Sequence, residues 1–177
     1  MKDSKNENNN KLNSLLSKYD NFVNRKKEKA KQERNERENF MDQFIKIRDK
    51  IIEPVFIHIK DQIESKGHKV NIIKKDSSWD DEKNIPIEPS ISFNLKLYTT
   101  NEKYLSRYHH TSRDLPQIMF ICDSNKKIIW SHESTIGPGH GGHSSSRNTF
   151  TAEQINKEIA KKELMEWIEI LMKEIIH

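Results

Sequence analysis

The sequence predicts an α+β fold with a long N-terminal helix, a four-stranded antiparallel sheet and a C-terminal helix, arranged as a two-layer α/β sandwich. Three observations indicate this class. Apolar residues recur every three or four positions over residues 12–23 and 40–63, alternate with polar residues in segments between 68 and 133, and return to helical spacing after residue 151. Because strands lie between helices in the chain, we expect both helices to cover one face of the sheet.

Composition separates the first 39 residues from the rest. Only eight apolar residues precede Phe40. Residues 1–11, rich in Asn, Lys and Glu, are too polar to form a core, so we expect a disordered tail. Residues 12–39 are predicted to form a helical extension, and residues 40–177 are long enough to bury the core of one compact α+β domain.

An apolar stripe opens the helical extension. Its six residues recur at steps of three and four, which is the pattern of an amphipathic helix. They are Leu12, Leu15, Leu16, Tyr19, Phe22 and Val23. Sixteen almost entirely polar residues separate the stripe from the compact domain. The stripe must therefore bind a partner, pack back on its own chain or lie exposed, and helix-in-groove or coiled-coil pairing would bury it. We expect a protein partner or a homo-oligomer.

The net charge of +4 is concentrated in one basic segment, residues 25–37, which contains seven Lys or Arg and three Glu. The rest of the chain is neutral overall, which argues against a generally basic nucleic-acid-binding protein. A second hypothesis is that this segment binds nucleic acid together with a downstream loop of aromatic and basic residues. The residues expected to make contact are Arg25, Lys26, Lys27, Tyr104, Arg107, Tyr108 and Arg113.

The helical pattern resumes at Phe40 and continues to Ile63. Pro54 has no backbone N–H, and its ring collides with the preceding turn of a helix. We therefore expect the helix to kink there or a second helix to begin. Gly67 supplies the left-handed residue that commonly ends a helix.

Four later segments read as strands because apolar residues alternate or cluster in short runs. They are residues 68–75, 91–98, 117–122 and 127–133. Turn-forming residues 123–126 indicate a hairpin between the last two strands. The run Ile118–Cys122 is apolar on both faces, which predicts a central strand. The thiol of Cys122 is then expected to pack as a small apolar group.

The C-terminal helix has a strong start signal. Thr151 can cap the first turn, and Gln154, three residues later, can complete a capping box. Phe150 and Ile155 are placed to form a hydrophobic staple across this start. The sequence therefore predicts a helix from about residue 151 to Ile176.

Four of the five glycines lie between residues 137 and 142, shortly before this helix. Convergent backbone amides and a helix N-terminus can hold an anion, so a third hypothesis is a small hydrolase or phosphate-ligand binder. Its expected residues are Gly139, His140, Gly141, Gly142, His143 and Arg147. The alternative is a simple turning connection, because this segment has no Gly-Lys-Ser/Thr of a P-loop and no Gly-x-Gly-x-x-Gly placed directly between a strand and a helix.

Other classes receive less support. No nucleophile elbow is present, so the sequence favours a non-enzymatic protein with no catalytic residues. His140 and His143 alone do not fix a tetrahedral site, and we expect no metal and no cofactor. The longest apolar run has five residues, and residues 1–11 lack the apolar core of a secretory signal, so we expect a cytoplasmic protein with no membrane partner.

Three motifs of the compact domain occur in a characteristic order. They are Phe44-x-x-Ile47-x-x-x-Ile51-Ile52-x-Pro54, then Gly67-His68 before a strand, then Ser134-Thr135-Ile136-x-Pro138-x-x-Gly141-Gly142 before a capped helix. Over residues 40–177 this order resembles small uncharacterised bacterial proteins. The resemblance implies a compact bacterial domain, and it carries over no activity and no functional residues.

Overall fold

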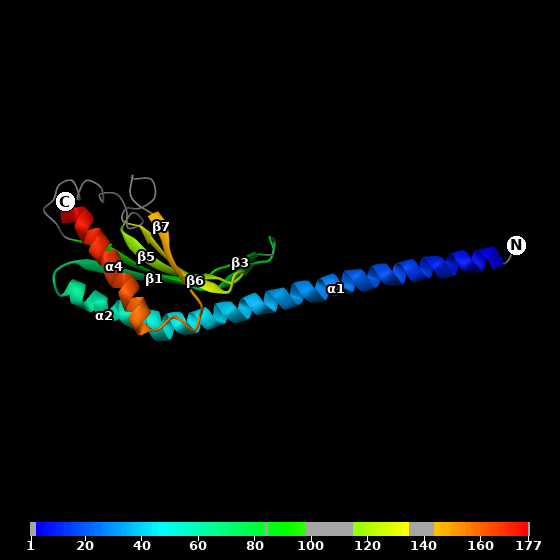
Figure 1. The fold of residues 1–177 in the computed structure, drawn as a ribbon, viewed down its shortest axis with the longest axis horizontal. Coiled ribbons are helices and arrows are strands. Elements are labelled where there is room, and N and C mark those ends of the chain that lie inside the picture. The colour runs from blue at the N-terminus through cyan, green and yellow to red at the C-terminus, as the bar shows by residue number, and fades with distance from the viewer. Residues whose placement is uncertain (1–2, 84, 98–114, 135–143, 177) are drawn as a thin grey trace. The chain divides into compact units, whose positions relative to one another are not determined.

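The first helix, α1, spans Asp3–Ile47 in a computed structural model that describes residues 3–83, 85–97, 115–134 and 144–176 (Figure 1). The chain divides into two compact units, Met1–Glu38 and Asn39–His177. This division lies next to the boundary predicted from composition. Helix α1 forms the described part of the first unit and continues into the second. The polar residues 24–39 are therefore helical, which their high helix propensity allows.

Helix α1 also begins earlier than the sequence predicts. Residues 1–11 are expected to be disordered, but the structure describes helix from Asp3 onward. Once a helix is nucleated, each further residue adds a backbone hydrogen bond, so a polar segment can extend it without burying side chains.

The helix changes form before Pro54. Helix α1 is followed by a five-residue π-helix, η1 (Arg48–Ile52), and then by α2 (Glu53–Glu64). Pro54 lies in the first turn of α2, directly after the wider π-helical turn in which the amide of Glu53 donates to the carbonyl oxygen of Arg48. The predicted interruption is therefore confirmed. The buried side chain of Arg48 donates from Nη1 to the carbonyl oxygen of Lys75 at 2.8 Å, which ties η1 to the sheet.

The second unit contains a five-stranded antiparallel sheet in the order β1-β4-β5-β6-β7. Its strands are β1 (Lys69–Lys75), β4 (Ser90–Lys96), β5 (Gln117–Asp123), β6 (Ile128–Ser134) and β7 (Ser144–Phe150). A separate two-stranded hairpin is formed by β2 (Ser78–Asp80) and β3 (Ile85–Ile87). The C-terminal helix, α4, spans Lys157–Ile176.

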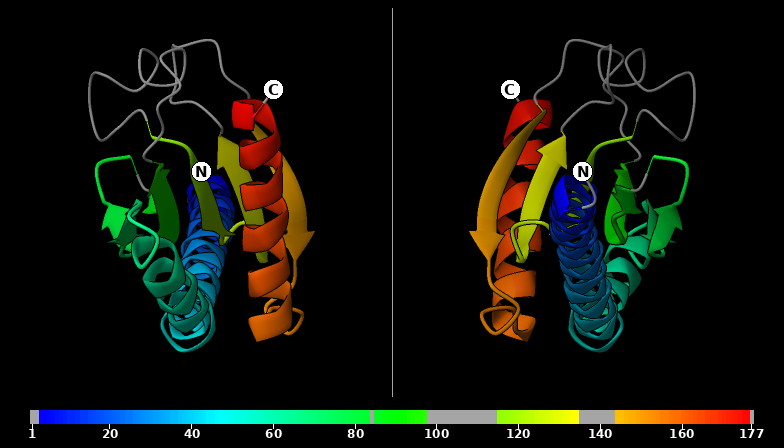
Figure 2. Two further views of the ribbon diagram at one scale, coloured as in Figure 1. Left: turned by 90° about the vertical axis from the view of Figure 1, so that its left-hand side faces the viewer. Right: turned by 90° about the vertical axis from the view of Figure 1, so that its right-hand side faces the viewer.

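Helices α2 and α4 lie on the same side of the sheet (Figure 2). Three aromatic residues join these layers. Phe56 of α2 contacts Phe93 of β4 with ring centroids 5.2 Å apart, and Trp167 of α4 contacts the same ring at 6.2 Å. All three side chains are fully buried. The predicted α+β class is therefore confirmed, with helices on one face of an antiparallel sheet.

The predicted number of strands is wrong. The sequence predicts four strands, but in the described residues the main sheet has five, and β2 and β3 add a hairpin. The fifth strand, β7, contains a run of serines and only one apolar residue, Phe150, so it lacks the alternation that marks a strand. As an edge strand it joins the sheet through backbone pairing with β6.

The predicted start of the C-terminal helix is also wrong. Residues 152–154 form a turn, in which the Thr151 amide donates to Oε1 of Gln154 at 2.7 Å, and α4 begins only at Lys157. Asn156 caps the helix, because its Oδ1 accepts from the amide of Ile159 at 2.9 Å. Thr151 and Gln154 do form a hydrogen bond, but this bond stabilises the turn before the helix and does not cap the helix.

This assignment predicts unequal effects for two substitutions. Asn156→Ala removes the cap of α4 and should lower the free energy of unfolding by about 1 kcal/mol. Thr151→Ala is the matched control and should cost less than about 0.5 kcal/mol, because Thr151 is exposed and alanine keeps the backbone amide that donates to Gln154. Urea unfolding followed by circular dichroism measures both. Equal losses would mean that α4 effectively begins at Thr151.

Candidate functional site

The apolar stripe lies on one face of α1 and is exposed. At 3.6 residues per turn, its six residues fall within an arc of about 120°. The exposed fractions of Leu12, Leu15, Leu16, Tyr19 and Phe22 range from 51% to 64%, and Val23 is partly buried. The other large apolar side chains that are exposed in the described residues are spread over α2, β1, β3 and α4: Ile57, Ile73, Ile85, Ile87 and Met165. Only in the stripe do several gather along one helix.

The opposite face of this part of α1 is polar, with exposed Ser14, Ser17, Asn21 and Asn24. The stripe itself occupies three columns of a seven-residue repeat: Leu12 with Tyr19, Leu15 with Phe22, and Leu16 with Val23. A two-stranded coiled coil needs only two such columns, so this stripe is broad enough to pack against a wider apolar surface.

The basic segment continues α1 as a charged helix surface. Lys29 pairs with Glu33 at 3.9 Å, and Arg34 pairs with Glu38 at 2.9 Å, both across one helical turn. Such exposed pairs support a solvated helix weakly, by about 0.3–0.5 kcal/mol each. The ammonium of Lys26 lies 4.8 Å from the centre of the Phe22 ring, so the stripe and the basic segment adjoin.

The nucleic-acid hypothesis stays a prediction. Arg25, Lys26 and Lys27 are exposed on α1, where they could contact phosphate. The aromatic and basic residues that were to complete the surface, Tyr104, Arg107, Tyr108 and Arg113, lie outside the described residues.

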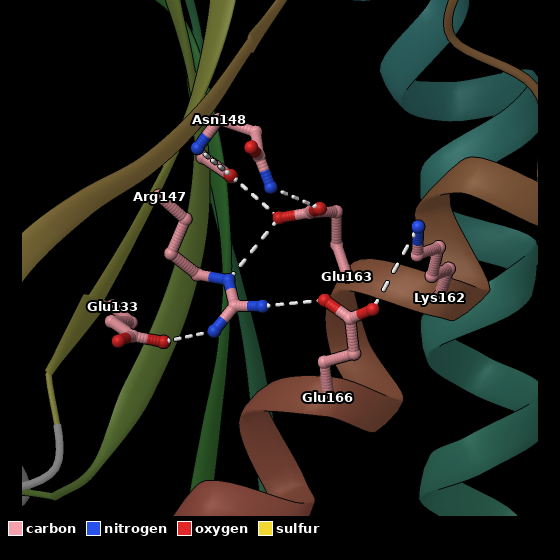
Figure 3. Close-up of polar contacts among 7 residues, drawn as sticks. Glu133, Arg147, Asn148, Lys162, Glu163 and Glu166 are labelled. Carbon is pink, nitrogen blue, oxygen red and sulfur yellow. Dashed lines mark hydrogen bonds and ion pairs between the residues drawn. The ribbon is translucent and has the colours of Figure 1, made fainter.

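The predicted anion loop is described only at Arg147. Its other residues, Gly139, His140, Gly141, Gly142 and His143, lie outside the described part of the chain. Arg147 belongs to a glutamate–arginine cluster with Glu133, Glu163 and Glu166 (Figure 3). Its Nη1 donates to Glu133, its Nε to Glu163 at 3.2 Å and its Nη2 to Glu166 at 2.9 Å. Each nitrogen of the guanidinium thus donates to a carboxylate, which disfavours Arg147 as a ligand for a further anion.

A β-bulge builds this cluster. Trp130 pairs with Thr149 and His132 pairs with Ser146, so Arg147 and Asn148 of β7 together oppose the single residue Ser131 of β6. Both side chains reach α4, where Asn148 donates from Nδ2 to Oε1 of Glu163 at 2.7 Å. The hydroxyl of Ser131 donates to Oε2 of the same carboxylate at 2.7 Å.

The cluster is a structural ion network. Burial alone would lower the pKa of Arg147, but hydrogen bonds and charge from Glu133 and Glu163 raise it above its usual value. Glu163 is 3% exposed and accepts three hydrogen bonds, so its charge is compensated. Sequence reasoning missed these glutamates. The sequence did contain a signal for Glu163. It lies between Ala160 and Trp167 on the buried face of α4, where an apolar residue is expected.

Other chemical groups in the described residues give no reactive site. No three His, Cys, Asp or Glu side chains among them gather in a way that could hold a metal ion. Cys122 is buried, and burial together with the charge of Glu88 raises its thiol pKa, so the thiolate nucleophile is disfavoured. In the same described part, no helix combines the length and apolar character that crossing a membrane requires.

A groove of about 390 Å³ lies between α2 and α4. Its walls are Pro54, Val55, His58, Ile59, Lys157, Glu158 and Lys161. The α2 wall covers six residues, or about 9 Å of helix, whereas the twelve-residue stripe is about 18 Å long. The groove is therefore too short to hold the whole stripe of another copy, and none of its residues forms a recognisable reaction centre.

Comparison with protein-family models, curated proteins and solved structures finds no match to this chain. Its function must therefore be argued from its own surfaces. Of the three surfaces considered, only the stripe is fully described and has its predicted residues on one exposed face.

Proposed function

We propose that this protein is a non-enzymatic interaction module whose contact surface is the apolar stripe of α1. The stripe binds a protein partner or a second copy of the chain. The observation that supports this function is the gathering of five large apolar side chains, each more than half exposed, between Leu12 and Phe22 on one helix face. Contiguous exposed apolar surface of this kind marks interaction sites in soluble proteins.

The free energy available at the stripe fits a reversible contact. Burying a Leu, Val or Phe side chain completely is worth about 1.5–3 kcal/mol. Side chains that are already about half covered would gain roughly half of this, or about 1 kcal/mol each. The six residues then contribute about 6 kcal/mol, and the partner's surface contributes a similar amount. Association costs about 4–15 kcal/mol, so we expect modest affinity that depends on concentration.

Polar substitution of the stripe should weaken partner binding without unfolding the protein. The double variant Leu15→Ser/Phe22→Ser removes about 2 kcal/mol of contact, which corresponds to roughly thirtyfold weaker binding. The matched control Ile57→Ser/Ile73→Ser changes two apolar residues, 45% and 48% exposed, outside the stripe. The immobilised full chain is exposed to an extract of the cells that make it, and retained proteins are identified by mass spectrometry.

We expect the stripe variant to lose proteins that both the parent and the control retain. Light scattering on the same variants detects self-association. If all three chains retained the same proteins and had the same mass in solution, the stripe would not be the contact surface. Thermal unfolding of each variant should stay cooperative, which shows that lost binding does not reflect lost folding.

A further inference from the structure

Four of the six stripe residues are complementary to the same residues of an antiparallel copy of α1. Consider two copies of α1 that pack antiparallel with residue 17 of one copy level with residue 17 of the other. Two residues then lie at the same level when their numbers add up to 34. Leu12 of one copy then faces Phe22 of the other, and Leu15 faces Tyr19. Each of these contacts pairs a leucine with a larger aromatic ring. The third column of the stripe does not take part, because Leu16 and Val23 fall level with Lys18 and Lys11 of the other copy. All four residues are more than half exposed in the single chain.

Charges beyond the stripe favour this direction. Residues 25–31 contain five Lys or Arg and one Glu, a net charge of +4. A parallel pair would place these two segments side by side, within the roughly 8–10 Å over which charges interact at physiological salt. It would also set Lys26 against Lys26, because Lys26 continues the column of Leu12 and Tyr19.

In the antiparallel pair, the two basic segments lie at opposite ends. Each faces residues 3–9 of the other copy, which contain two acidic residues and one lysine, a net charge of −1. Antiparallel pairing thus replaces a repulsion between two +4 segments by an attraction at each end.

From this complementarity we infer that the partner of the stripe is a second copy of this chain, packed antiparallel along α1. The inference rests on the proposed function and specifies its partner.

Disulfide crosslinking of the full chain tests the direction. The variants Leu12→Cys and Phe22→Cys are oxidised mildly, alone and as an equal mixture. Antiparallel pairing places residue 12 against residue 22, so the mixture should give at least fivefold more covalent dimer than either variant alone. Ser17→Cys is the control, because Ser17 lies on the polar face and should not crosslink. The native Cys122 is 1% exposed and should not react.

Each other outcome has a clear meaning. Efficient dimers from Leu12→Cys alone and from Phe22→Cys alone would show parallel pairing and overturn the inference. A mass of one chain by light scattering at every concentration, with no crosslinking, would overturn self-association itself. In that case the proposed function still stands if Leu15→Ser/Phe22→Ser loses a protein that the parent retains, so the two failures are distinguishable.

Discussion

Replacing Glu163 by alanine is expected to lower the free energy of unfolding by about 3–5 kcal/mol. The carboxylate is 3% exposed and accepts hydrogen bonds from Ser131, Arg147 and Asn148. Alanine leaves three donors without this acceptor and removes a buried charge partner of the guanidinium. Breaking a buried ion pair from one side is costly because the remaining polar groups stay away from water.

Glu166→Ala is the matched control for Glu163→Ala. Glu166 contacts the same guanidinium at 2.9 Å and lies three residues further along α4, but its side chain is 43% exposed. Water can replace this interaction, so we expect a loss below about 1 kcal/mol. Urea unfolding of both variants measures the difference. Equal losses would show that burial does not set the energetics of the glutamate–arginine cluster.

The elements predicted correctly from sequence are those with a strong apolar period. Helix α2, strands β4, β5 and β6 and helix α4 completely bury Phe56, Phe93, Phe120, Ile129 and Trp167, one residue each. The apolar residues of each element repeat with its spacing. Strand β7 escaped prediction because an edge strand is held by backbone pairing, which leaves little trace in side-chain sequence. The start of α4 was misplaced because Thr151 and Asn156 are both good caps, and only packing decides between them.

The candidate sites show the same limit. An apolar period predicts a helix face, but exposure of the stripe had to come from the structure. For Arg147, the neighbouring glycines suggested an anion ligand. Its actual partners, Glu133 and Glu163, are 14 and 16 residues away in the chain. A bulge in β7 brings them together, and a one-residue register shift of this kind cannot be derived from local sequence.

Phenylalanine to alanine substitutions at two positions separate core from contact surface. Phe56 is fully buried, with its ring 5.2 Å from Phe93 and 6.1 Å from Phe120. Phe56→Ala leaves a cavity beneath α2 and should lower the free energy of unfolding by about 3–5 kcal/mol. Phe22→Ala makes the same chemical change on the stripe, where the side chain is 55% exposed, and should change stability by less than about 0.5 kcal/mol.

Chemical unfolding at a concentration where the chain is a single copy measures both variants, so that any self-association does not contribute. The comparison also bears on function. If Phe22→Ala destabilised the single chain as much as Phe56→Ala, the stripe would be packing back on its own chain, and its residues would not be free to contact a partner. We expect Phe22→Ala to have a small effect on the stability of the single chain and the stripe variant to lose binding. This combination identifies an interaction surface, because side chains that contact a partner contribute little to folding.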